Sequence, residues 1–140
     1  MSYKVTVEPS GRSFEVPADQ TILQAGIAQN IPLPYGCQDG ACGSCKCKKI
    51  SGEVTLSEYQ EKALTPQELA DGFILTCRAR PHSDVVLESR QVGSGDAFPV
   101  KKLPARVFSI EECAPDVKKI VLQLPAAAPF AYHAGQYIEV

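Results

Sequence analysis

The chain has 140 residues, of which 44% are apolar and 21% are charged, and its net charge at pH 7 is −2. These values are typical of a globular protein, and so small a net charge gives no reason to expect binding to nucleic acid or to a membrane surface. Because no apolar run is long enough for a signal peptide (about 7–15 residues) or a membrane span (roughly 20 residues), we predict a soluble, cytoplasmic protein.

The first predicted elements are a β-hairpin and a helix. Apolar and polar residues alternate over residues 2–17, on both sides of the turn sequence PSGR, which is typical of two antiparallel strands. Thr21 and Gln24 then form a capping-box pair ahead of an apolar stripe. This pattern predicts a helix of about ten residues that ends before Pro32.

A cysteine-rich loop comes next, followed by a strand and a second helix. Residues 45–54, CKCKKISGEV, predict a third strand and a turn. In LTPQELADG, Thr65 has the place of an N-cap, Pro66 that of the first helical residue, and Glu68 completes a capping box. These residues predict a short helix.

Two strands, Phe73–Ala79 and Asp84–Ser89, complete a predicted α+β domain over residues 1–89. Gly, Ser, Pro and Lys dominate residues 90–104, which indicates a linker. Residues 105–140 contain two strand patterns and the beginning of a third, yet fewer than about 40 residues rarely form a core of their own. We interpret them as the truncated start of a second domain.

The cysteines of the loop GCQDGACGSCKC carry the strongest functional signal. Cys37, Cys42 and Cys45 have the spacing C-x4-C-x2-C, and Cys77 follows later in the chain. This is the known ligand pattern of plant-type [2Fe–2S] clusters, so the assignment rests on matching an established spacing. Clustered cysteines in an intracellular protein also usually bind metal or do redox work. We predict that these four residues bind the metal cofactor, a [2Fe–2S] cluster.

Two alternatives account for fewer of these observations. Disulfides would need an oxidising compartment, which nothing in the sequence indicates. A structural zinc ion could use Cys42 and Cys45 together with Cys77 and either Cys37 or His82. Zinc sites prefer two closely spaced ligand pairs, however, and the second pair is missing here. The spacing therefore favours the cluster.

The glycines of the loop and the two remaining cysteines are assigned different roles. Gly36, Gly40 and Gly43 are expected to adopt positive φ and to bring backbone N–H groups close to the cluster sulfurs. Cys47 is interpreted as a small buried hydrophobic residue rather than a fifth ligand, and Cys113 as a packing thiol.

The sequences YGCQDGACGSCKCKKISGEV and ILTCRARP resemble the ferredoxin-like [2Fe–2S] domains of bacterial NAD(P)H-dependent reductases. The resemblance covers residues 2–89 and implies a β-grasp fold. It also implies that Cys37 and Cys42 hold the iron nearer the surface, whereas Cys45 and Cys77 hold the more enclosed iron. A cluster of this kind in plant-type ferredoxins has a potential near about −400 mV.

The C-terminal segment resembles the first strands of a flavin-reductase β-barrel, which binds FAD. The resemblance rests on the strand pattern and on Gly135-Gln136-Tyr137. A cluster domain followed by a flavin domain is similar to the reductases that serve aromatic-ring dioxygenases and phenol or methane monooxygenases, and to CDP-6-deoxy-glucoseen reductase. We expect FAD and NAD(P)H to bind only to the intact parent protein, because the sequence ends before the R-x-Y-S element that binds flavin in that family.

The resemblance implies a path for electrons. Hydride from NAD(P)H would enter FAD as an electron pair, and the cluster would pass the electrons singly to a partner. The expected partners are the flavin domain of the same polypeptide and a downstream metalloenzyme, either an oxygenase or a dehydratase. The parent would be an NAD(P)H-dependent iron–sulfur flavoprotein oxidoreductase, and this chain its electron-transfer module.

Two other functions stay open at this point. The first is a freestanding ferredoxin-type electron carrier, and the second is an interaction module stabilised by zinc. Residues 1–89 carry eight Lys or Arg and eleven Asp or Glu, a net charge of −3. A diffusing carrier generally gains from a stronger field of one sign, whereas a tethered domain works at high effective concentration. The weak charge therefore favours the tethered module.

Overall fold

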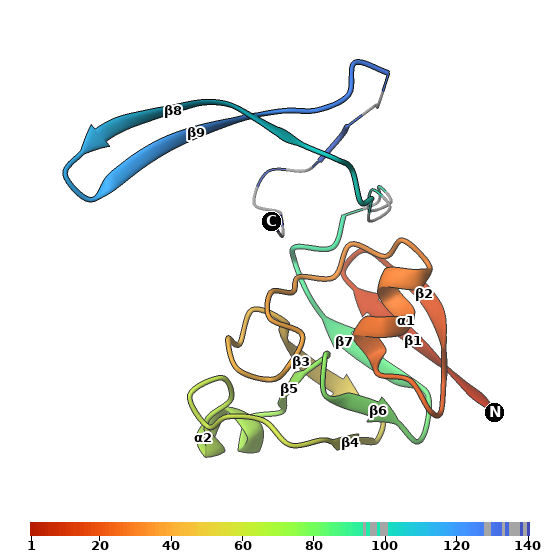
Figure 1. The fold of residues 1–140 in the computed structure, drawn as a ribbon. Helices are drawn as coiled ribbons and strands as arrows, with labels where there is room; N and C mark the ends of the chain where they lie inside the picture. Colours follow the sequence, from red (N-terminus) through yellow and green to blue (C-terminus); the bar gives the residue numbers. More distant parts are fainter. Residues whose placement is uncertain are drawn as a thin grey trace. The chain divides into compact units, whose positions relative to one another are not determined.

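The computed structural model of the chain describes residues 1–93, 95, 98, 101–127, 130–132, 134, 138 and 140. These residues form two compact units, one that contains β1 to β7 with both helices and one that contains β8 and β9 (Figure 1). Within the described residues, no helix has the length and apolar character needed to cross a membrane.

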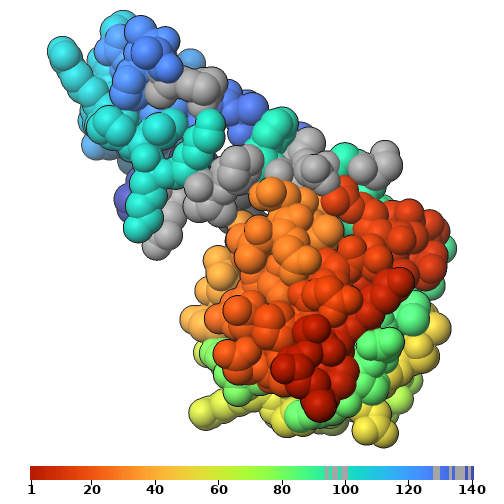
Figure 2. Space-filling view, turned by 90° about the vertical axis from the view of Figure 1, so that its right-hand side faces the viewer, coloured from red at the N-terminus to blue at the C-terminus, as the bar shows by residue number. Residues whose placement is uncertain are grey.

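The predicted N-terminal hairpin and first helix are confirmed. Strands β1 (Ser2–Glu8) and β2 (Arg12–Pro17) pair antiparallel. Helix α1 (Ile22–Ala28) begins after Thr21, whose hydroxyl accepts a hydrogen bond from the backbone N–H of the predicted capping partner. The helix has seven residues rather than about ten, because the chain turns into the left-handed region at Asn30, where φ is 56°. Figure 2 shows the hairpin and the segment after it, in red and orange, covering one face of the first unit.

Further along the first unit, the chain forms β3 (Lys46–Ser51), β4 (Val54–Leu56), α2 (Pro66–Ala70), β5 (Phe73–Leu75), β6 (Ala79–Pro81) and β7 (Val85–Glu88). The main sheet has the order β2-β1-β7-β3-β5, and β1 and β7 at its centre run parallel. A second, two-stranded sheet joins β4 to β6. Five antiparallel or parallel strands with two short helices give the α+β arrangement that the sequence predicts.

The prediction of one strand over Phe73–Ala79 is wrong, because a turn at residues 76–78 separates β5 from β6. The backbone N–H and the hydroxyl of Thr76 both donate to the carbonyl of Cys45, and Arg78 N–H donates to the carbonyl of Leu75 at 3.0 Å. These bonds remove the backbone from the strand ladder. Cys77 therefore lies in a turn that is tied to the end of the cysteine-rich loop, not on a rigid strand.

The core of the first unit lies under the main sheet and includes residues from beyond the predicted domain end. Val92 is 3% exposed and belongs to the same buried cluster as Val5 and Leu87. Ser89 N–H donates to the carbonyl of Glu8 at 2.9 Å. The chain is therefore still packed against the first unit after Ser89, and the division at residues 89 and 104 stays a prediction.

The second unit is an antiparallel hairpin of β8 (Arg106–Ala114) and β9 (Val117–Gln123), which confirms the first two strand patterns of the C-terminal segment (Figure 1). Its paired apolar side chains are exposed to solvent. Val107 pairs with Leu122 and Ile110 with Ile120, and these four side chains are between 39% and 60% exposed. The third strand pattern, with Gly135-Gln136-Tyr137, falls largely outside the described residues.

Candidate metal centre

The loop that carries three of the predicted ligands joins α1 to β3 without regular secondary structure. Gly40 and Gly43 have φ values of 81° and 76°, as predicted. Gly36 does not, and Gln38 takes positive φ in the loop instead, at 61°. Gly36 is needed for space, because a Cβ atom there would lie 3.1 Å from Cys42 Sγ.

Backbone N–H groups of the loop converge on the sulfurs of its first two cysteines. Ala41 and Cys42 donate to Cys37 Sγ at 3.3 Å, and Cys37 and Ser44 donate to Cys42 Sγ at 3.4 and 3.3 Å. The N–H of Cys37, followed by the hydroxyl and N–H of Ser44, lowers the pKa of Cys42 to about 6. Because these N–H groups donate to sulfur, they stabilise the thiolate form of the two cysteines, which is the form that binds metal.

The other two predicted ligands form a buried pair. Cys45 is 3% exposed and Cys77 is 6% exposed, and their Sγ atoms lie 3.3 Å apart. Burial is the main cause that raises the pKa of Cys77 to about 12. A buried thiol such as Cys77 loses its proton more readily where a positive charge compensates for the missing water, which is what bound iron would supply.

The two remaining cysteines differ in their surroundings. Cys47 is 3% exposed on β3, as predicted, and burial raises its pKa to about 12. The side chain of Ser89 acts in the opposite direction and lowers this pKa, but burial outweighs it. Cys113 is exposed on β8, so its prediction as a packing thiol is wrong, because the β8–β9 hairpin provides nothing that covers it.

The four predicted ligands fall into pairs, and this grouping fits a two-iron cluster. Cys37 and Cys42 are exposed, whereas Cys45 and Cys77 are buried. In the part of the chain that the structure describes, no three His, Cys, Asp or Glu side chains converge on one point that could hold a metal ion. A [2Fe–2S] cluster needs two thiolates at each iron, so the pairs fit its requirement; the ligand assignment itself stays a prediction.

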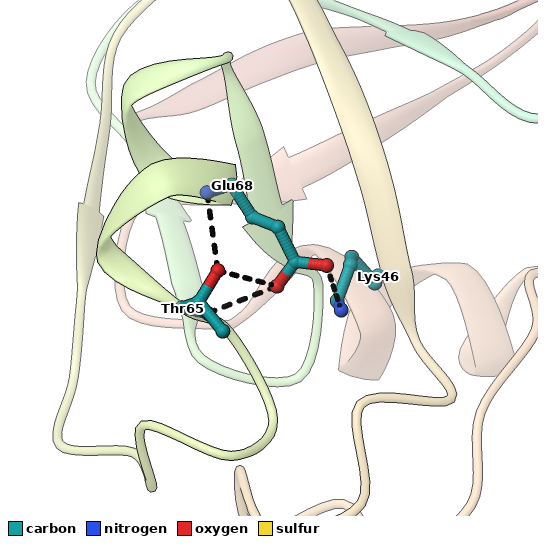
Figure 3. Close-up of polar contacts among 3 residues, drawn as sticks. All are labelled: Lys46, Thr65 and Glu68. Carbon is teal, nitrogen blue, oxygen red and sulfur yellow. Dashed lines mark hydrogen bonds and ion pairs between the residues drawn. The ribbon is translucent and has the colours of Figure 1, made fainter.

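The surroundings of the loop contain residues that sequence reasoning missed. Arg78 follows Cys77 directly, and its Nη2 donates to the carbonyl of Asp39 in the loop. In the sequence, this role is indicated only by the position of an arginine directly after a predicted ligand. Lys46 follows Cys45 in the same way, and its Nζ lies 2.7 Å from Oε1 of Glu68, which also caps α2 with Thr65 (Figure 3). This ion pair connects the end of the loop to α2.

Comparison with known proteins identifies the family to which the chain belongs. Residues 5–82 match the family described as the 2Fe-2S iron-sulfur cluster binding domain, and the chain belongs to this family. The fold-class prediction and the [2Fe–2S] cofactor prediction are thereby confirmed.

Two relatives align over the whole chain. The chain is 39% identical to the CDP-6-deoxy-L-threo-D-glycero-4-hexulose-3-dehydrase reductase of Yersinia pestis, over 100% of its own length and 42% of that protein. It is also 39% identical to the phenol hydroxylase P5 protein of Acinetobacter pittii, over 100% of its own length and 40% of that protein. The chain therefore spans about two fifths of the length of these curated relatives.

Among solved structures, the chain is similar to the cytochrome P450 reductase GcoB of Amycolatopsis. The two are 34% identical, and the match has a TM-score of 0.66 over 96% of this chain and 39% of the reductase. The resemblance to reductases that the sequence suggests is thus confirmed for both units, because the aligned part extends beyond the first one.

Proposed function

We propose that this chain is the [2Fe–2S] module of an NAD(P)H- and FAD-dependent reductase and that it delivers electrons singly to a partner oxygenase or dehydratase. The observation that carries the proposal is the arrangement of four thiols in an exposed and a buried pair, inside the segment that matches the cluster-binding family. A bound [2Fe–2S] cluster supplies a one-electron redox couple. The relatives named above are reductases or a component of a phenol hydroxylase, which supports the proposed direction of electron flow.

We infer that Cys37, Cys42, Cys45 and Cys77 are the cluster ligands. The exposed pair would face the electron partner, and the N–H groups around it stabilise the negative charge that reduction adds. The buried pair would anchor the cluster to the core and keep water away from it. No side chain of the chain needs to act as an acid or base in this role, because electron transfer moves no proton to a protein group.

The remainder of the proposal concerns the division of the chain. We infer a cluster domain over residues 1–89, a linker over residues 90–104 and the start of an FAD-binding β-barrel over residues 105–140. The exposed apolar pairs of β8 and β9 support this, since a two-stranded hairpin in water is marginally stable and gains from further strands. The flavin domain of the same polypeptide would then be the electron donor, and the hairpin favours this arrangement over a freestanding carrier.

Cluster content tests the ligand set directly. The full chain, purified without oxygen, should contain equal amounts of iron and acid-labile sulfide, absorb visible light and give an EPR signal after reduction by one electron. Cys42→Ser and Cys77→Ser should each abolish these signals, whereas Cys113→Ser should retain them because this thiol lies in the other unit. Unchanged absorbance and EPR in the first two variants would refute the ligand assignment. Bound zinc without colour would refute the redox function.

A further inference from the structure

Arg78 binds the turn of the cluster loop whose backbone N–H groups approach Cys37 Sγ. Its Nη2 donates to the carbonyl of Asp39, and its Nε is buried beside Gly40. A Cβ atom on Gly40 would lie 3.0 Å from Arg78 Nε and 2.8 Å from Tyr59 Cβ. The Asp39–Gly40 turn is therefore enclosed between Arg78 and Tyr59.

Backbone N–H groups at this turn donate to a cysteine sulfur. Asp39 N–H donates to Cys37 Sγ at 3.5 Å, and the N–H of Ala41, the residue that follows the turn, donates to the same sulfur at 3.3 Å. The orientation of the turn thus determines both hydrogen bonds to Cys37 Sγ, in the exposed pair. Gly40, with φ of 81°, has no side chain that could fix this orientation by itself.

Two hydrogen bonds fix the backbone of Arg78 itself. Its carbonyl accepts a hydrogen bond from Ser57 N–H at 2.9 Å, and its N–H donates to Leu75 at 3.0 Å. The carbonyl of Gly40 accepts from Gln60 N–H at 3.0 Å, so residues 57–60 contact both the arginine and the turn. A planar guanidinium held at its base can fix the position of what it binds more closely than the flexible ammonium of lysine can.

We propose that Arg78 is a positioning residue that holds the Asp39–Gly40 turn so that the N–H groups of Asp39 and Ala41 face Cys37 Sγ at the cluster. This inference rests on the proposed ligand set. Hydrogen bonds to the sulfurs stabilise the more negative, reduced state, so a loosened turn should make reduction harder and cluster loss faster. The buried Nε atom lies against Gly40, so the guanidinium is enclosed on that side while its Nη2 atom binds the turn.

Arg78→Lys is the decisive variant, since it keeps the positive charge and loses the planar fork. Arg78→Gln loses both, and Arg80→Gln is the matched control, because Arg80 has an exposed side chain two residues further on and carries the same charge. For the full chain with its cluster, we expect Arg78→Lys to release iron to a chelator roughly tenfold faster, the effect of one charge-assisted hydrogen bond. Its reduction equilibrium should shift by up to tenfold, about 59 mV more negative for one electron, with an altered EPR line shape.

Each outcome decides the matter. If Arg78→Lys matches the wild type in potential, EPR spectrum and iron release, the proposal is wrong. It is equally wrong if only the two glutamine variants shift, and by the same amount, because charge alone would then explain the effect. Loss of regular secondary structure in both Arg78 variants would make the residue a determinant of the fold, which also overturns the proposal. Failure of the ligand set is recognised separately, by cysteine variants that keep the cluster while Arg78 is intact.

Discussion

The two buried thiols next to Cys45 provide a sharp test of how this chain divides its cysteines between metal binding and packing. Cys47 and Cys77 are 3% and 6% exposed, and burial raises the pKa of each to about 12. They differ in position: Cys77 Sγ lies 3.3 Å from Cys45 Sγ, whereas Cys47 lies on β3, where its backbone pairs with Ile74. We predict that Cys47→Ala retains the cluster and that Cys77→Ala loses it.

The stability cost of Cys47→Ala can be estimated from its packing. The substitution removes one buried atom from a strand whose backbone pairs with Ile74. A buried group of about methylene size contributes roughly 0.8 kcal/mol, and the void that remains raises the cost to about 1–2 kcal/mol. For a domain of this size, such a loss lowers the melting temperature by about 5–15 °C.

The assay combines visible absorbance and iron content with thermal unfolding, on wild type, Cys47→Ala and Cys77→Ala prepared in parallel. The expected result is a separation: Cys47→Ala melts earlier with full cluster content, while Cys77→Ala is colourless. If Cys47→Ala lost the cluster while its fold persisted, Cys47 would be a ligand. The inference from position would then be refuted, and with it the choice of Cys77 over its buried neighbour.

Two further predictions concern the frame around the loop. Gly52 and Gly72 both have positive φ, but a Cβ on Gly52 would overlap the carbonyl of Asp84, whereas one on Gly72 would meet its nearest atom at 3.4 Å. Gly72→Ala should therefore cost about 1 kcal/mol and Gly52→Ala about 3 kcal/mol or more in urea unfolding, and equal costs would contradict this reading. Hydrogen bonding to Lys46 holds the pKa of Glu68 below its ordinary value. The stabilisation by the Glu68 carboxylate should be present near neutral pH and disappear as the pH falls through the lowered pKa. The difference in melting temperature between wild type and Glu68→Gln should therefore shrink on acidification. A difference that does not depend on pH would argue against the ion pair.

Local patterns in the sequence predict those elements that local interactions determine. The hairpin at residues 2–17 and the two capping boxes need only their own residues, and all of them are present in the structure. The spacing of Cys37, Cys42 and Cys45 is likewise a property of one loop. These features can be inferred from sequence because no distant contact competes with them.

Features that depend on distant contacts could not be inferred in the same way. The apolar run from Phe73 onward indicates a strand, but Thr76 binds Cys45, 31 residues earlier, and this contact creates the turn that carries Cys77. Strand β4 has three residues and exists through its pairing with β6. Val92 lies in a segment with the composition of a linker, yet it is buried in the core. In each case tertiary contact overrides the local signal.

The arrangement of the thiols also bears on where the proposed electron partner would bind. Cys45 and Cys77 lie against the core, and the turn that carries Cys77 is joined to the loop by Thr76 and Arg78. Cys37 and Cys42 are exposed, so the edge that they form is the side of the proposed site that a second protein could approach. The N–H donors of Ala41 and Ser44 concentrate at the same edge, where they stabilise added negative charge. Exposure and hydrogen-bond donors thus coincide at one edge, which is where the proposed electron exchange would take place.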